Sequence, residues 1–223
     1  MRRSRRKDIR RDQFVDGVEK ILKWGLSHRD RALTIIIGII AAVVIGYSIL
    51  TPKENFNPQA ELILFQAKEL MGIGKFEDSE QLLTYLIQNF GNTSSGVRGY
   101  YYLGVIHSAT GKFEEALKDF DRYLGTSSKS FILKPSAYVG RGGAREATGD
   151  LEGAYEDYKK AAESKTAVSI IARLEMGRVA GLLGRIDEAE SILDKIIDEE
   201  AGSTIADDAR LYLGYIRSRS PTD

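Results

Sequence analysis

The longest apolar stretch of the chain runs from residue 32 to residue 50, where nineteen consecutive positions carry no charge. As a helix this stretch would be about 28 Å long, close to the thickness of the hydrocarbon core of a bilayer. The pattern therefore predicts a transmembrane helix over residues 32–50. Within it Gly38, Ala42 and Gly46 lie four residues apart. Small residues at this spacing form a seam on which a second membrane helix can pack closely.

Beyond a short linker at residues 51–57, apolar positions recur three or four residues apart, in segments separated by glycine-containing turns. This periodicity predicts amphipathic helices and an all-α fold. We expect the helices at residues 58–72, 76–90, 97–110, 113–124, 136–148, 151–163, 168–183, 186–199 and 204–217. Residues 58–217 then form one helical domain, followed by a tail at 218–223.

The predicted helices pair into a repeat. Four turn glycines follow one another at intervals of 37, 38 and 35 residues: Gly74, Gly111, Gly149 and Gly184. A small residue lies seven positions before each of them: Ala67, Gly104, Gly142 and Gly177. Another small residue lies five positions after it (Ser79, Ala116, Ala154, Ala189) and a large one nine positions after it (Leu83, Phe120, Tyr158, Leu193). Gly214 repeats the first small position, and no second helix is predicted after it. Such a period is typical of helical solenoids.

Two antiparallel helices approach closely only where one of them carries a small side chain, and a turn glycine adopts a backbone conformation that is costly for other residues. With these positions, residues 58–217 resemble the tetratricopeptide repeat (TPR). The third repeat departs at Arg141, where an apolar residue is expected. The resemblance implies a right-handed α-solenoid of about four helix pairs, with residues 204–217 as a solvating, capping helix.

Basic residues are concentrated before the apolar stretch. Residues 1–31 contain eleven Lys or Arg and five Asp or Glu, a net charge of +6, so the rest of this neutral chain carries −6. The excess of basic residues predicts a cytoplasmic N-terminal tail and an extracytoplasmic helical domain. The acidic balance of that domain argues against nucleic-acid binding. A cleaved signal peptide is the alternative, with a weak small-x-small match at residues 46–48, but its basic region would be unusually long.

Residues 12–30 place apolar side chains on one helical face. They predict an amphipathic helix in the lipid headgroup region, with Trp24 near the interface. The arginine-rich first eleven residues either contact anionic lipid or serve only as a topology signal.

No pattern in the chain predicts catalysis. There is no cysteine, and of two histidines His28 precedes the apolar stretch while His107 falls at a position that packs inward in TPRs. No group of residues has the spacing of zinc ligands. We therefore expect a protein that is not an enzyme and that needs no cofactor or metal.

In a TPR array the first helix of each pair lines a concave groove. The resemblance places these residues in the groove: Leu64, Lys68 and Met71; Arg98, Tyr101, Val105 and Ser108; Ser136, Val139, Gly143 and Glu146; Ile171, Leu174 and Arg178; Leu211 and Tyr215. The Lys/Asn pairs that clamp a peptide carboxylate in some TPRs are absent from these positions. The groove is predicted to be apolar and rich in tyrosine, with Arg98, Arg145 and Arg178 at its rim, and to bind an amphipathic helix or an extended apolar peptide.

A basic tail, one span and degenerate TPRs together resemble a bacterial inner-membrane TPR family that includes the ancillary subunit of the SecYEG translocon. This resemblance implies a periplasmic scaffold or chaperone-like factor whose partners are the translocon, a membrane-anchored chaperone or secretory clients. A structural subunit of a larger envelope machine remains the alternative. Partner identity and oligomeric state are left open by the sequence.

Overall fold

The computed structural model describes residues 15, 18–19, 26–50, 55–126 and 132–219, which fall into two compact units, residues 1–53 and 54–223. The basic tail at 1–11 and most of the predicted amphipathic helix at 12–30, including Trp24, lie outside the described residues. Linker residues 51–54 and tail residues 220–223 do so as well.

The first unit contains helix α2 (Arg29–Leu50). Large aliphatic side chains are at least half exposed along it: Leu33, Ile35, Ile36, Ile37, Ile39, Ile40, Val43, Val44 and Ile45. Because a helix turns by about 100° per residue, these positions cover all sides of α2. Among the residues that the structure describes, no helix was found that is both long and apolar enough to cross a membrane. The transmembrane helix at 32–50 stays a prediction.

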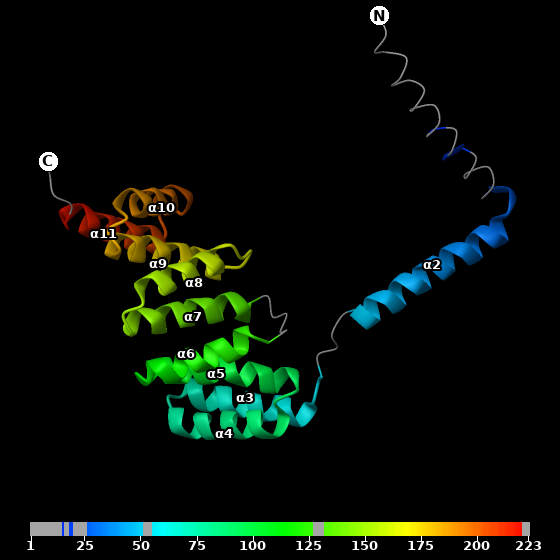
Figure 1. Ribbon diagram of the computed structural model, residues 1–223, viewed down its shortest axis with the longest axis horizontal. Coiled ribbons are helices and arrows are strands. Elements are labelled where there is room, and N and C mark those ends of the chain that lie inside the picture. Colours follow the sequence, from blue (N-terminus) through cyan, green and yellow to red (C-terminus); the bar gives the residue numbers. More distant parts are fainter. Residues whose placement is uncertain (1–14, 16–17, 20–25, 51–54, 127–131, 220–223) are drawn as a thin grey trace, which may run out of the picture. The chain divides into compact units, whose positions relative to one another are not determined.

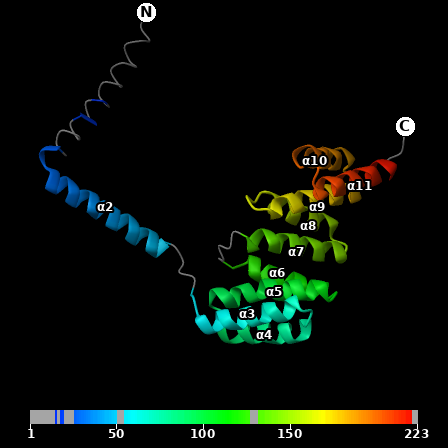
Figure 2. The same ribbon diagram turned by 180° about the vertical axis from the view of Figure 1, so that it is seen from behind.

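The second unit is a stack of helices that follow one another in chain order, as Figures 1 and 2 show from opposite sides. They are α3 (Pro58–Gly72), α4 (Phe76–Phe90), α5 (Ser94–Ala109), α6 (Phe113–Leu124), α7 (Leu133–Ala147), α8 (Leu151–Ala162), α9 (Val168–Leu182), α10 (Ile186–Glu199) and α11 (Thr204–Arg219). Each contacts its neighbours in the chain, and the odd-numbered helices also contact the next odd-numbered one. The predicted all-α solenoid of four helix pairs and a final helix is confirmed for the described residues.

The four turns within the pairs share one helix-ending motif. Gly74, Gly111, Gly149 and Gly184 have φ between 76° and 88°. The residue after each glycine donates its backbone N–H to a carbonyl five positions earlier, for example Lys112 to His107 at 2.8 Å. This is the Schellman arrangement, in which a residue with positive φ ends the helix and satisfies its last carbonyls. The glycine spacing in the sequence therefore marked real helix ends.

Two helices begin three residues earlier than expected. Helix α5 begins at Ser94 because Thr93 caps it, its side-chain Oγ1 accepting a hydrogen bond from the backbone N–H of Gly96 at 3.0 Å. Helix α7 begins at Leu133, before Pro135. A proline in the first helical turn needs no intrahelical N–H partner, so Pro135 does not delay the start.

The small residues of the repeat are the points of closest packing. A Cβ added to Gly104 would lie 2.8 Å from the ring of Phe120, and one added to Gly142 would lie 2.7 Å from the ring of Tyr158. Phe120 and Tyr158 are buried in separate core clusters along the stack. The core is thus a series of local clusters, each closed by a large side chain seated on a glycine.

Candidate functional site

The candidate site is the surface formed by the odd-numbered helices, where the sequence placed its groove. Two of its predicted residues are not on any surface. Leu64 is 1% exposed and Leu174 5% exposed, and each belongs to a core cluster. The groove assignment of these two residues is therefore wrong. Both side chains point into the contact between successive helices, where burial of a leucine side chain contributes about 2 kcal/mol to stability.

An aromatic cluster occupies the middle of the surface. The ring of Tyr101 lies 5.0 Å from that of Tyr102, 6.2 Å from that of Phe120 and 5.7 Å from that of Tyr123. Tyr101 is only partly exposed, and burial raises the pKa of its hydroxyl. Tyr101 therefore leaves only part of its ring on this surface. Tilted aromatic pairs of this kind contribute about 1 kcal/mol beyond their buried area.

The side chains around this cluster differ in exposure. Val105 and Val139 are partly buried against the core, whereas Lys68 and Gly143 are exposed. The ammonium of Lys68 lies 5.6 Å from the centre of the Tyr102 ring. Met71, Ser108 and Ser136 are partly buried; the Ser136 hydroxyl donates to the carbonyl of Ile132 at 3.0 Å. Ile171 is 45% exposed on α9.

The predicted basic rim is largely neutralised by carboxylates. Arg98 on α5 binds Glu61 on α3, and the Ser95 hydroxyl donates to the same carboxylate at 2.5 Å. The hydrogen bond from Ser95, helped by the charge of Arg98, holds the pKa of Glu61 below its ordinary value against the opposing effect of burial. Arg98 thus joins two repeats and is not a free cation.

Arg178 on α9 is held in the same way. Its guanidinium donates to both oxygens of Glu146 at 2.8 Å, and it pairs with Glu175 at 2.6 Å. Burial alone would lower the pKa of Arg178, but the hydrogen bond to Glu146 and the charge of Glu175 raise it above its ordinary value. Glu146 also accepts a hydrogen bond from the hydroxyl of Tyr158. The predicted groove residues Glu146 and Arg178 are therefore brought together as one structural pair.

Sequence reasoning missed a buried ion pair in the third repeat. Asp157 is fully buried and accepts hydrogen bonds from Arg141 at 2.8 and 2.6 Å, and it pairs with Arg145 at 3.0 Å. The departure from the repeat pattern at Arg141 was the available signal. A buried carboxylate is stable only when its charge is compensated, so Arg141 replaces the expected apolar residue together with Asp157. Arg145 is part of this cluster and not a free rim cation.

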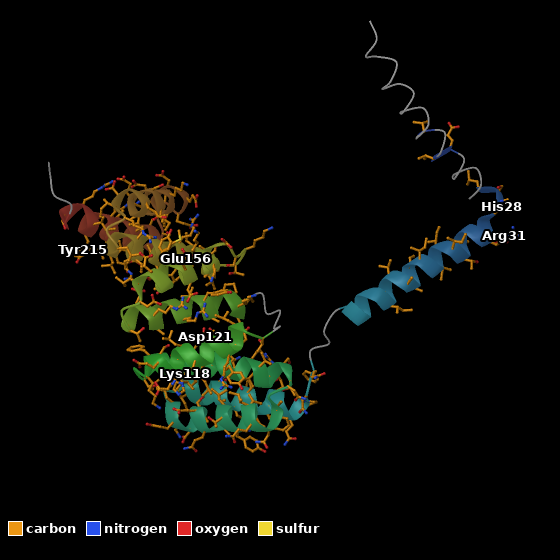
Figure 3. All side chains as sticks on the ribbon, viewed as in Figure 1. His28, Arg31, Lys118, Asp121, Glu156 and Tyr215 are labelled. Carbon is orange, nitrogen blue, oxygen red and sulfur yellow. The ribbon has the colours of Figure 1, made fainter. Side chains whose placement is uncertain are left out.

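A cavity of about 800 Å³ lies at the C-terminal end of the surface, between α9 and α11. It is lined by Arg178, Gly181, Leu182, Arg210, Leu211, Tyr212, Gly214, Tyr215, Ile216 and Ser218. Leu211 is 69% exposed, Tyr215 50% and Leu182 46%. The position of Tyr215 on α11 is labelled in Figure 3. The predicted groove included Arg178, Leu211 and Tyr215, and the repeat pattern marked Gly214; the other lining residues were not predicted.

Helix α11 was predicted as a solvating cap, and two of its exposed side chains are apolar: Leu211 and Tyr215, beside Leu182 of α9. Its other large exposed side chains are charged, among them Asp207, Arg210 and Arg217. The capping role of α11 stays a prediction. Exposed apolar residues that are grouped in this way mark interaction surfaces.

His107 is the histidine of the helical domain, and its two ring nitrogens face carboxylates. His107 is buried between two carboxylates, with Nδ1 2.6 Å from Asp119 and Nε2 3.4 Å from Glu80. Among the residues that the structure describes, no group of three or more His, Cys, Asp or Glu could hold a metal ion. His107 links α4, α5 and α6, which is the structural role that its repeat position indicated.

The small residues of α2 were predicted as a helix-packing seam. A Cβ added to Gly38 or Gly46 would meet no other described atom within 4 Å, and Ala42 is exposed. The seam is open in this unit, and its use by a second helix stays a prediction.

Comparison with known proteins agrees with this architecture. A tetratricopeptide repeat family model matches residues 66–131. A search of curated protein sequences found no match. Residues 66–131 thus carry a recognisable TPR sequence, and the other repeats rest on the fold.

Several solved structures share the fold. A kinesin light chain–like protein from Podosopora anserina with nearly identical TPR-like repeats matches with a TM-score of 0.60 and 14% identity, over 72% of this chain and 86% of that one. A TPR protein from Parabacteroides merdae gives 0.61 and 20%, over 73% and 61%. YrrB, a TPR protein with an unusual peptide-binding site, gives 0.56 and 18%, over 71% and 78%. The helical domain therefore has a TPR-like solenoid fold.

Proposed function

We propose that this protein is a non-enzymatic scaffold that binds segments of other proteins on the surface of its odd-numbered helices. The observation that carries the proposal is the apolar surface at α9 and α11, where Ile171, Leu182, Leu211 and Tyr215 are all more than two-fifths exposed. The charged residues beside it are engaged in structural pairs, so apolar contact dominates what this surface offers. An amphipathic helix or an extended apolar segment matches it in chemistry.

Site-specific photo-crosslinking in intact cells tests this proposal. A photoreactive residue at Ile171 reports on the surface, and the same residue at the exposed Glu156 on α8 is the matched control (Figure 3). We expect protein adducts from Ile171 and few from Glu156. Equal crosslinking from both positions, or none from Ile171, would contradict the proposal.

We further propose that α2 anchors the protein in the cytoplasmic membrane of a bacterium, with the TPR domain on the extracytoplasmic side. Two observations support this: large aliphatic side chains are exposed on every side of α2, and residues 1–31, before its uncharged stretch, contain eleven basic residues. An exposed helix that is apolar all round is unfavourable in water, at roughly 25 cal/mol for each Å² of apolar surface. Residues 1–31 then lie in the cytoplasm.

The absence of native cysteine makes this topology directly measurable. Ser4→Cys places a single thiol in the N-terminal tail and Ser218→Cys places one on α11. A maleimide that cannot cross the inner membrane is expected to label S218C, and to label S4C only after the membrane is permeabilised. Labelling of S4C in intact spheroplasts, or recovery of the protein in the soluble fraction, would contradict the anchor model.

Two partner classes fit this layout, and the Ile171 adducts separate them. A chaperone-like factor for secreted or envelope proteins would give many heterogeneous adducts together with translocon subunits or a membrane-anchored chaperone. A structural subunit of an envelope machine would give one dominant adduct. We favour the chaperone-like reading because an open apolar surface suits varied clients.

A further inference from the structure

Three repeats share one packing contact between their two helices. In α5, α7 and α9 a glycine receives a large side chain from the helix that follows it. A Cβ on Gly104 would lie 2.8 Å from Phe120, one on Gly142 2.7 Å from Tyr158, and one on Gly177 2.9 Å from Leu193. Each large residue is preceded, four positions earlier, by a buried alanine: Ala116, Ala154 and Ala189. The following helix therefore presents a small residue and then a large one, one turn apart.

The residue four positions before each glycine obeys a related rule. It contacts a charged residue near the end of the same following helix. Tyr100 lies 5.8 Å from the guanidinium of Arg122, and Tyr138 lies 5.6 Å from the ammonium of Lys160. Arg173 instead pairs with the carboxylate of Glu199 at 2.6 Å. At this position a tyrosine thus meets a basic side chain of the following helix, and an arginine meets an acidic one.

Helix α11 carries the same two positions without a following helix among the described residues. Gly214 lies 37 residues after Gly177, and Arg210 lies where Arg173 does in α9. A Cβ on Gly214 would meet no described atom within 4 Å. Arg210 and Gly214 line the cavity of about 800 Å³ described above. Arg210 pairs with Asp207 on its own helix, in a contact where both side chains are about half exposed or more.

We propose that α11 is an acceptor for an amphipathic α-helix of a partner protein, which packs on α11 as the second helix of each pair packs on the first. The inference rests on the proposed scaffold function and specifies the partner's chemistry. The partner helix presents a small residue, a large aromatic or aliphatic residue four positions later that enters the space over Gly214, and a carboxylate about six positions after that beside Arg210. This last spacing is that of Leu193 and Glu199 in α10.

A second copy of the chain is a poorer occupant on the same evidence. The helices of this chain with the small-then-large pattern are already packed in its own repeats. In a parallel pair of α11 helices Arg210 would face Arg210, and like charges repel. In an antiparallel pair centred on Gly214, Arg210 would face Ser218 and meet no carboxylate there. In both pairs glycine would face glycine and the space over Gly214 would stay unfilled, so the geometry favours a foreign helix.

The chain's own α10 provides a defined probe. A fluorescently labelled synthetic peptide of residues 186–199 carries Ala189, Leu193 and Glu199 in the required order. Its binding to the full-length protein in detergent micelles is measured by fluorescence anisotropy. Saturable binding is expected, and a peptide with Leu193→Asp is expected not to bind.

Variants of α11 test whether the peptide binds at Gly214 and Arg210. Gly214→Leu fills the space and is expected to weaken peptide binding at least about tenfold, the equivalent of losing most of one buried leucine. Leucine favours an exposed helical position over glycine, so this variant is expected to fold, and circular dichroism checks that it does. Gly72→Leu, at an exposed glycine at the end of α3 where a Cβ would also meet no atom within 4 Å, is the matched control and is expected to bind as the unmodified protein does. Arg210→Glu is expected to weaken binding and a peptide with Glu199→Lys to restore it.

Three results would overturn the proposal: no saturable binding, equal binding by G214L and the unmodified protein, or a dimer that G214L dissociates in sedimentation analysis. The last would assign α11 to a second copy. Crosslinking from Ile171 in the G214L background keeps the two proposals apart. If Ile171 still forms adducts but the peptide does not bind the unmodified protein, only the proposed partner-helix site on α11 is refuted. If Ile171 forms no adducts but the peptide binds, only the proposed binding surface along the other odd-numbered helices is refuted.

Discussion

At the scale of single residues, glycine has two opposite roles on the helices of this domain. Gly142 is covered by the ring of Tyr158, whereas Gly214 faces open space. Adding one methyl group at these two equivalent repeat positions is therefore expected to have opposite effects on stability. Where the space is filled, a Cβ forces the neighbour to move. Where it is empty, a Cβ only improves helix propensity.

Gly142→Ala and Gly214→Ala form a matched pair that tests this contrast. We expect Gly142→Ala to lower the free energy of unfolding by about 1–3 kcal/mol, because the Tyr158 ring is held by its hydrogen bond to Glu146 and cannot easily give way. Gly214→Ala should raise it by about 0.5–1 kcal/mol. Urea denaturation followed by circular dichroism measures both. A destabilising Gly214→Ala would mean that the space is not open.

Asp157 predicts a larger effect. Replacing it by Ala leaves Arg141 and Arg145 without their buried partner, which we expect to cost about 3–5 kcal/mol of unfolding free energy. The double variant Arg141→Leu with Asp157→Leu should lose less than Asp157→Ala alone, since the buried charge of Arg141 is then removed as well and Arg145 keeps its ion pair with Asp150. An equal loss in both, measured by denaturant titration, would show that the pair itself stabilises the fold.

The helices themselves were largely readable from the sequence. The spacing of the glycines predicted the turns correctly, because these helices end at a residue with positive φ and glycine adopts that conformation at the lowest cost. The starts of α5 and α7 were missed because a threonine cap and a proline in the first turn extend a helix beyond its apolar pattern. The site was less readable: the burial of Leu64 and Leu174 depends on the angle between helices, which the periodicity does not give.

Contacts between helices also predict a pH dependence. Glu80 on α4 accepts a hydrogen bond from Lys112 at 3.0 Å and lies 3.4 Å from His107. The hydrogen bond from Lys112, with that from His107, lowers the pKa of Glu80 despite burial. A carboxylate whose folded pKa is lowered stabilises the fold above its unfolded pKa, and this stability is lost as the pH falls through the folded pKa.

Glu80→Gln should therefore reduce stability at neutral pH and flatten its fall below about pH 4.5. Burial raises the pKa of Asp119, so its contribution to stability decreases as the pH rises. This contribution is present in E80Q and in the unmodified protein alike. Denaturation at a series of pH values measures the difference, with Glu77→Gln at an exposed position of α4 as the control. Parallel pH curves for E80Q and the unmodified protein would contradict the assigned link.

On the scale of the helical domain, stability is distributed along a line. Each described helix of the domain packs on its neighbours in the chain, and the odd-numbered helices also pack on the next odd-numbered one. Such a stack behaves as a row of units coupled to their neighbours, so its ends open more easily than its middle.

Hydrogen exchange should show this gradient. Amides of α6 to α8, which have neighbours on both sides, are expected to exchange more slowly than those of α11, whose outer face is uncovered. The α10 peptide should slow exchange in α11 and leave α4 unchanged. Uniform protection along the domain would show that it unfolds as one cooperative unit.

The neighbour-only contacts also bear on how the domain is made. Because the two helices of each pair are joined by a three-residue turn, a pair can close as soon as it has been synthesised, without waiting for distant sequence. Folding can therefore proceed from α3 onward while later repeats are still emerging. Among the described helices α11 is then the last to form, and until a partner covers it, its open face remains exposed.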